Sequence, residues 1–288
     1  GSAPLVHARS VERDILAAMA RPWTVQELPP TWPDRVSVGS PSGMARALKG
    51  LVGLAEPVET DLPLPDYLLE EFHWMPNGYY SHNQAEGYNR GFELSMMGLI
   101  QGARDTAAQR LASEGARTAL DVGAGTGRQA AALLDAGVDE VWGLEPSPYL
   151  LNIAAAEFPR VRFVQGVIED CELPSGYFDA VAACFLFHEL PAEIAEGALS
   201  RLHACMSRGA LLAITEPGPA QVRTDLVSLA LRHGLRGLWF GWLGRFVYEP
   251  YLDQWHDTEP AGWLARHGFQ LIQDREELPF RTLLARRC

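Results

Sequence analysis

The fold of this 288-residue chain is decided by the stretch Thr118-Ala119-Leu120-Asp121-Val122-Gly123-Ala124-Gly125-Thr126-Gly127. A short apolar run leads directly into three glycines at alternate positions. Glycine has no Cβ, so it permits a tight turn in which backbone amides near a helix N-terminus can face a polar or anionic ligand. The stretch therefore predicts a strand, a ligand-binding turn and the start of a helix.

Outward from this turn, short apolar runs alternate with helical patterns to the end of the sequence. We expect strands at 118–122, 140–145, 161–165, 178–185 and 209–215, and helices at 127–136, 148–157, 191–207, 221–236 and 260–267. This alternation predicts a Rossmann-like, doubly wound α/β fold, in which helices cover both faces of a parallel sheet. The last two strands, 269–275 and 280–286, are too close for a crossover helix and should form an antiparallel hairpin.

The segment before the turn has a different pattern. A helical pattern at Val11–Met19 is followed by a proline-rich stretch and then by longer helical patterns over 84–114. We predict an N-terminal helical cap or lid over residues 3–114 and a core over 115–288, with an aromatic insertion at about 217–258.

Charge and cysteine usage narrow the class of protein. The chain has 24 basic and 36 acidic side chains, a net charge of −12, so its surface should repel nucleic-acid phosphates. The four cysteines lack zinc-ligand spacing, and no apolar run reaches the ~20 residues that span a bilayer. We expect a soluble, cytoplasmic protein with a small-molecule substrate and no membrane partner; a homo-oligomer is left open. No metal site is expected, because His73 and His82 lack a third ligand.

Glu145 ends the second expected strand, 18 residues after Gly127. A carboxylate there can accept both hydroxyls of a ribose. By themselves, the glycines could form only a tight turn, and Glu145 could be only a solvated strand end. The glycine turn and Glu145 on successive strands together favour a nucleoside cofactor. The third glycine of the dinucleotide motif is replaced by Arg128, which disfavours a nicotinamide oxidoreductase.

Together with the segments 173–181 and 211–217, these motifs resemble the class I S-adenosylmethionine-dependent methyltransferases over about residues 115–288. The resemblance implies a seven-stranded sheet, S-adenosyl-L-methionine as cofactor and S-adenosyl-L-homocysteine as product. It also implies that the glycine turn takes the methionine part and Glu145 the ribose. The cofactor-binding residues that we expect on this basis are Asp121, Gly123, Gly125, Gly127, Glu145, Pro146, Val167, Ile168, Glu169 and Phe185. The family often has an aspartate after the third strand, where this chain has Val167; Glu169 or Asp170 is then left to reach the adenine.

Three residues are candidates for catalysis. His188 follows the fourth strand, where ligands of doubly wound sheets bind, and a histidine removes a proton near neutral pH. Glu216 ends the fifth strand, and His82 precedes the core. The alternatives are a backbone cap for His188 and a loop contact for Glu216. Methyl transfer requires neither residue in principle, because positioning in a dry site supplies much of the rate.

Aromatic residues supply the candidates for substrate binding. A lid before the core would contribute Tyr79, Tyr80, Tyr88 and Arg90, and the insertion would contribute Trp239, Trp242, Phe246 and Tyr251. The alternative is ordinary core packing. We predict methyl transfer to an oxygen or carbon nucleophile of a small, largely apolar molecule, as in bacterial natural-product biosynthesis. The rivals are a non-methylating rearrangement on the same fold and a protein that only senses the cofactor.

Overall fold

The computed structural model of the chain describes residues 22–31, 34, 65–70, 72–73 and 78–288. The expected helix at Val11–Met19 and most of the proline-rich stretch lie outside these residues. So does the segment 74–77 of the expected lid.

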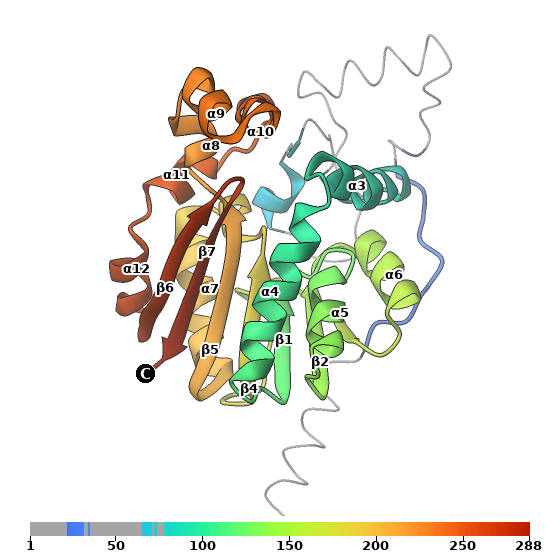
Figure 1. The fold of residues 1–288 in the computed structure, drawn as a ribbon. Helices are drawn as coiled ribbons and strands as arrows, with labels where there is room; N and C mark the ends of the chain where they lie inside the picture. Colours follow the sequence, from blue (N-terminus) through green and yellow to red (C-terminus); the bar gives the residue numbers. More distant parts are fainter. Residues whose placement is uncertain (1–21, 32–33, 35–64, 71, 74–77) are drawn as a thin grey trace, which may run out of the picture.

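The core is one seven-stranded sheet in the order β3-β2-β1-β4-β5-β7-β6 (Figure 1). The strands are β1 (Thr118–Val122), β2 (Glu140–Glu145), β3 (Arg162–Gln165), β4 (Phe178–Cys184), β5 (Met206–Pro217), β6 (Phe269–Glu277) and β7 (Phe280–Arg287). The first five are parallel, whereas β7 pairs antiparallel with both β5 and β6. The predicted doubly wound fold with an antiparallel C-terminal hairpin is therefore confirmed.

Alternating side chains of the central strands bury the two faces of the sheet in two separate cores. In β1, Leu120 and Val122 join one hydrophobic cluster, and Ala119 joins the other. The first face is covered by α7 (Ala192–Cys205) and α12 (Pro260–Arg266), the second by α4 (Leu99–Ser113), α5 (Arg128–Asp135) and α6 (Pro148–Glu157). Because α4 packs in the second layer, it is part of the core although the predicted cap range of 3–114 includes it.

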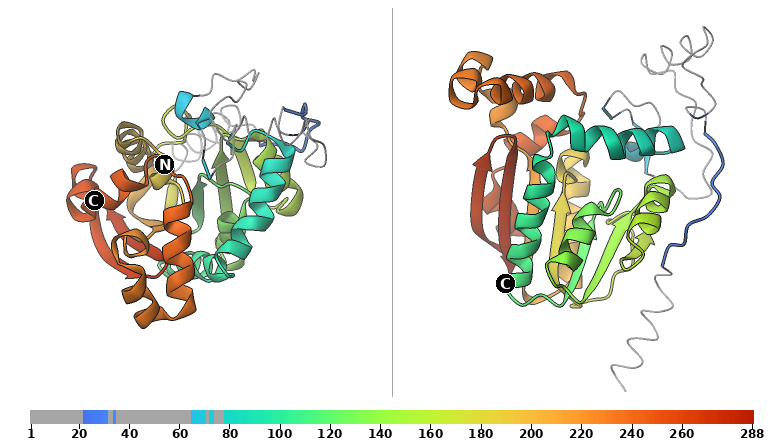
Figure 2. Two further views of the ribbon diagram at one scale, coloured as in Figure 1. Left: turned by 90° about the horizontal axis from the view of Figure 1, so that it is seen from above. Right: turned by 45° about the vertical axis from the view of Figure 1, so that its right-hand side comes forward.

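The carboxyl ends of the parallel strands are covered by helices from two distant parts of the chain. From before the sheet comes α3 (His82–Ser95), which lies across the strand ends (Figure 2). From the insertion come α8 (Ala220–Arg223), α9 (Leu226–His233), α10 (Leu235–Phe246) and α11 (Leu252–Asp257). The two parts leave room between them at the strand ends, where an apolar cavity lies.

The single helix predicted over 221–236 is wrong. The side chain of Asp225 accepts a hydrogen bond from the backbone N–H of Ser228 and starts α9 anew, and Gly234, at φ 62°, separates α9 from α10. The apolar periodicity that continues through these residues belongs to two helices that fold back on each other.

Gly237 allows α9 and α10 to approach closely. A Cβ added at this position would lie 2.1 Å from the carbonyl oxygen of Leu229. We expect Gly237→Ala to lower the free energy of unfolding by about 1–3 kcal/mol, the usual cost of overpacking. Denaturant unfolding tests this against Gly102→Ala in α4, where an added Cβ meets nothing within 4 Å and should cost nothing. Equal stability of the two variants would contradict the close approach.

In the part of the chain that the structure describes, no helix combines the length and the apolar character needed to cross a membrane. The four cysteines are all free thiols.

Candidate active site

The glycine turn and Glu145 form one hydrogen-bonded unit. One carboxylate oxygen of Glu145 accepts from the N–H of Gly125 at 2.8 Å, and the other accepts from the N–H of Ser147 at 2.9 Å. Gly125 has φ 53°, a conformation that side chains with a Cβ rarely adopt. Burial raises the pKa of Glu145 to about 7, despite these two hydrogen bonds, which act to lower it. The carboxylate is therefore positioned at the turn, but its charge is poorly solvated.

A narrow cavity of about 80 Å³, the turn cavity, opens beside this unit. The residues lining it include Gly123, Gly125, Glu145, Pro146, Tyr67, Tyr79, Tyr80, Tyr88 and Phe185. The first four come from the ends of β1 and β2, and the tyrosines come from the segment before the sheet. A polar turn thus faces an aromatic wall.

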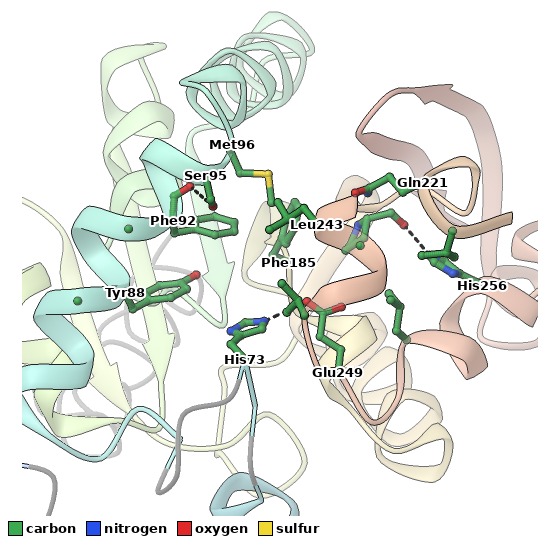
Figure 3. Close-up of a pocket in the computed structure, with 17 residues that line it drawn as sticks. His73, Tyr88, Phe92, Ser95, Met96, Phe185, Gln221, Leu243, Glu249 and His256 are labelled. Atoms are coloured by element: carbon green, nitrogen blue, oxygen red, sulfur yellow. Dashed lines mark hydrogen bonds and ion pairs between the residues drawn. The ribbon is translucent and has the colours of Figure 1, made fainter. Parts of the chain in front are cut away.

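A second cavity of about 250 Å³, the apolar cavity, lies between α3 and the insertion. Figure 3 shows its labelled walls, which include Tyr88 and Phe92 from α3, Met96 just after it, and Gln221, Leu243 and His256 from the insertion. Among the described residues that line it there is no lysine or arginine. This cavity suits an apolar molecule that enters between the two helical parts.

Tyr88 and Phe185 line both cavities and separate them. Phe185 follows β4 with φ 60°, an unusual backbone conformation for an aromatic residue. Its N–H donates to the carbonyl of Thr215, and its ring contacts those of Phe92 and His188 edge-on. The two cavities therefore meet at an aromatic partition beside His188.

His188 is held by Glu216 in the buried core of the site. Both side chains are fully buried, and Nδ1 of His188 lies 2.5 Å from one carboxylate oxygen of Glu216. The other oxygen of Glu216 accepts from the N–H groups of Leu186 and Phe187. Because Glu216 is acceptor-only when ionised, Nδ1 carries the proton in the neutral ring, and only this neutral form has a lone pair on Nε2 of His188.

A second carboxylate and a second histidine face that lone pair. Glu249, from the insertion, has a carboxylate oxygen 3.7 Å from Nε2 of His188 and 3.0 Å from Nε2 of His73. The other ring nitrogen of His73 lies 3.2 Å from the hydroxyl of Tyr79, which donates to Glu189. We call His73, His188, Glu189, Glu216 and Glu249 the polar cluster.

The polar cluster changes the expected protonation of His188. Burial disfavours the imidazolium, but the charges of Glu249 and Glu216 outweigh it and raise the pKa of His188 to about 9. The sequence-based expectation assumed an ordinary imidazole, largely neutral at pH 7. In this environment the imidazole stays neutral only where another positive charge balances the carboxylates.

The expected cofactor residues divide into two groups. Those that line the turn cavity are Gly123, Gly125, Glu145, Pro146 and Phe185. The others lie behind it. An added Cβ at Gly127 would be 2.6 Å from the Phe163 ring, so this glycine serves packing, and burial raises the pKa of Asp121 to about 8 below the turn. Ile168 belongs to the hydrophobic core, Val167 does not line the cavity, and Glu169 accepts from Tyr67.

The expected substrate residues mostly lie elsewhere than predicted. Tyr88 lines the apolar cavity, but Tyr79 and Tyr80 line only the turn cavity. The remaining side chains line neither. Trp242 and Phe246 stack on each other at the surface, Trp239 donates to the Ser95 carbonyl, Tyr251 donates to Glu70, and Arg90 pairs with Glu86 in solvent. His82 is exposed at the start of α3, bonded to the Leu28 carbonyl, and does not meet His188.

Sequence reasoning missed the role of Glu249 and the partners of His73. Glu249 stands in the aromatic run Tyr248-Glu249-Pro250-Tyr251, where a single carboxylate among apolar residues is a usable signal. Nothing in the sequence indicates that this carboxylate meets a histidine 176 positions away.

The sequence of this chain is similar to those of known methyltransferases. Residues 119–209 match the family described as a methyltransferase domain, which confirms the predicted resemblance for this segment. Uncharacterized methyltransferases of Mycobacterium tuberculosis and Mycobacterium bovis are 34% identical over 73 residues, 25% of this chain and 30% of each relative. The chain thus matches less than a third of the length of these curated relatives.

Solved structures resemble the chain over a longer range. The Burkholderia thailandensis 1,6-didemethyltoxoflavin-N1-methyltransferase, with bound 1,6-didemethyltoxoflavin and S-adenosylhomocysteine, is 18% identical with a TM-score of 0.50; the match covers 80% of this chain and 93% of that one. Magnesium protoporphyrin IX methyltransferase from Synechocystis, with bound S-adenosylmethionine, is 16% identical with a TM-score of 0.49, covering 80% and 100%. At these identities the likeness concerns the fold alone.

Proposed function

We propose that this chain is an S-adenosylmethionine-dependent methyltransferase that methylates an oxygen or carbon nucleophile of a small, largely apolar molecule. The observation that carries the proposal is the pair of cavities that meet at Tyr88 and Phe185. One is built on a glycine turn with a carboxylate; the other is apolar, with His73 and Glu249 of the polar cluster in its wall. A donor and an acceptor can then react across one aromatic partition.

The turn cavity fits the cofactor through its own groups. An added Cβ at Gly125 would have only Tyr88 nearby, at 4.0 Å, so backbone can be approached there. Glu145 has about four acceptor positions and uses two of them on backbone N–H groups, which leaves acceptors for a ribose diol. When bound, S-adenosylmethionine supplies an electrophilic methyl group on a sulfonium. The residues proposed to hold it are Gly123, Gly125, Glu145 and Pro146.

Cofactor entry requires the turn cavity to widen. Its volume is well below the ~300 Å³ at the lower end of small-molecule sites. The wall that would move is the tyrosine side, because Tyr67, Tyr79 and Tyr80 come from outside the sheet, whereas Gly123 and Glu145 are fixed by β1 and β2. Closure of that wall would then exclude water from the reaction.

The acceptor would occupy the apolar cavity with its nucleophile toward Phe185. The polar cluster would activate that nucleophile through His73 and Glu249, which line the apolar cavity. His188, held by Glu216, lines neither cavity and would act through Glu249, 3.7 Å from its Nε2. The walls exclude water, and the partition aligns the nucleophile for in-line attack. The apolar lining favours a largely apolar acceptor, and we place the reaction in bacterial natural-product biosynthesis.

A binding and product experiment tests the proposal. Calorimetry with S-adenosylmethionine should give one site per chain, and mass spectrometry of reactions with a library of apolar hydroxyl compounds should detect products heavier by one methyl group. Binding without methylated product or S-adenosylhomocysteine would favour a sensor. A rearranged product of unchanged mass would favour the other rival.

Removal of the Glu145 carboxylate should weaken cofactor binding. We expect Glu145→Ala to reduce S-adenosylmethionine affinity by about 1.5–3 kcal/mol, the scale of charge-assisted hydrogen bonds. Calorimetry measures the loss against Glu157→Ala at the end of α6, which lines neither cavity and should bind normally. Unchanged affinity in folded Glu145→Ala would place the ribose elsewhere.

The raised pKa of Glu145 also predicts a pH dependence of binding. Ribose hydroxyls donate to the ionised carboxylate, so they bind the deprotonated form and lower its pKa in the complex. With a pKa of about 7 in the free protein, affinity should fall as pH drops below 7, by about tenfold per unit. Calorimetry between about pH 5.5 and 8 measures this trend, and Glu145→Gln should bind independently of pH. A flat wild-type profile would argue against ribose contact.

A further inference from the structure

We propose that His73, His188 and Glu249 bind a divalent first-row transition-metal ion beside the apolar cavity. Their ligand atoms all lie within 4.8 Å of one another. The carboxylate oxygen of Glu249 is 3.0 Å from Nε2 of His73 and 3.7 Å from Nε2 of His188. Two ligands of one ion, each bonded at ~2.1 Å, stand about 3 to 4 Å apart, so both distances to Glu249 match a metal site with two histidines and one carboxylate.

The outer contacts of the two histidines are those that metal ligands need. Nδ1 of His188 is bonded to Glu216, and Nδ1 of His73 is bonded to the hydroxyl of Tyr79, which in turn donates to Glu189. Each ring is thereby oriented with Nε2 toward Glu249. A carboxylate or polar group on the far nitrogen is the usual second layer around a metal-bound histidine, since it fixes the tautomer and the ring.

In the neutral ring, the lone pair of His188 meets no hydrogen-bond donor among the described residues. Its Nε2 is buried and has no hydrogen-bond partner among the described residues. At 3.7 Å, Glu249 is too far for a hydrogen bond, yet close enough to share an ion. Hydrogen bonds alone therefore do not explain why His73, His188 and Glu249 lie together, because Nε2 of His188 takes part in none.

Backbone strain at His73 also supports a metal site. This residue has φ 52°, which non-glycine residues rarely adopt, and its N–H donates to the carbonyl of Tyr248, next to Glu249. The contact joins the segment before the sheet to the insertion at the point where the two ligands meet. The strain is retained where the ring is presented to Glu249.

The charge of the cluster also favours a cation. Glu189, Glu216 and Glu249 bring three carboxylates together, and no lysine or arginine is among the described residues that line the apolar cavity. A divalent ion balances much of this charge while leaving both imidazoles neutral.

The inference rests on the proposed function and narrows its acceptor. His73 and Glu249 line the apolar cavity, so open coordination positions would face the acceptor. An oxygen donor fits such a position, which favours an alcohol, phenol or enol on an apolar body. Coordination would weaken the O–H bond; the proton would pass to a carboxylate of the polar cluster, and the electron pair would stay on the oxygen, which is then the nucleophile. His188 would act as a ligand in this step.

Metal binding by the full chain tests the inference directly. After treatment with a chelator, the protein is titrated with Zn²⁺ and Mn²⁺ by calorimetry, and its metal content is measured after dialysis. We expect one equivalent in the wild type and an affinity at least 100-fold lower in Glu249→Gln and in His73→Gln. Glu216→Gln should lower the affinity by about 10- to 100-fold, the usual effect of an outer partner.

A matched control separates this site from surface binding. Glu196 pairs with His267 on the surface, so Glu196→Gln removes a carboxylate from another histidine–glutamate pair and should leave metal affinity unchanged. No bound equivalent, or equal binding by Glu249→Gln and His73→Gln in folded form, would overturn the inference. S-adenosylmethionine binding measured on the same samples reports on the proposed function separately: loss of the metal site with normal cofactor binding and methylation leaves that function standing.

Discussion

Replacing His188 by alanine is expected to reduce turnover by roughly 10²- to 10⁴-fold, the range that a group assisting proton removal contributes. The side chain is fully buried and lines neither cavity. Nδ1 is fixed by Glu216, and Nε2 faces Glu249, which lines the apolar cavity where the nucleophile is proposed to lie. Water cannot easily replace it in a buried site. Cofactor affinity should change little, because His188 does not line the turn cavity. Calorimetry and the rate of S-adenosylhomocysteine release measure the two effects.

Two further variants identify the cause of the loss. His188→Gln keeps most of the volume, so it tests whether a cavity left by alanine disturbs the site. His233→Ala removes an exposed histidine at the end of α9 and should retain full turnover. If folded His188→Ala keeps more than about a third of wild-type turnover, the residue is a structural cap and positioning accounts for the rate.

Much of the fold could be predicted from sequence because its signals are local. The strands 118–122 and 140–145 and the helix 148–157 have the predicted bounds. Continuous apolar runs mark the strands, and Ser147 caps the helix in front of Pro148. The predicted helix ends were wrong where one apolar pattern runs through two helices. At Gly234, for example, α9 ends and α10 begins, although the apolar periodicity continues.

In the candidate site, too, the parts with local sequence signals could be predicted and the others could not. The glycine turn and Glu145 could be predicted because they lie on successive strands, and parallel neighbours bring their carboxyl ends together. The polar cluster could not, since His73, His188 and Glu249 meet only when the segment before the sheet and the insertion pack over the strand ends. The density of aromatic residues predicted that the insertion forms a wall of the cavity, but not which of its side chains face inward. Leu243 lines the cavity, while the neighbouring Trp242 is exposed.

The largest loss of cofactor binding is expected from Gly125→Val. A branched side chain at φ 53° strains the backbone, displaces the N–H that holds Glu145, and fills the space at the turn where the cofactor is proposed to lie. We expect S-adenosylmethionine affinity to fall at least ~100-fold, a loss of about 2.7 kcal/mol or more. Because an added Cβ meets only Tyr88, at 4.0 Å, the core should stay folded. Calorimetry and thermal unfolding measure the two quantities.

Two other glycines separate the possible causes. Gly115 has φ 89° with nothing within 4 Å of an added Cβ, so Gly115→Val carries backbone strain alone and should bind normally. Gly127→Val would drive its side chain into the Phe163 ring, where an added Cβ is only 2.6 Å away, and should lower stability more than Gly125→Val does. Normal binding by Gly125→Val would refute the placement of the cofactor at the turn. Loss of binding in Gly125→Val, with stability no lower than in Gly115→Val, assigns the effect to the cavity itself, because strain is common to both variants.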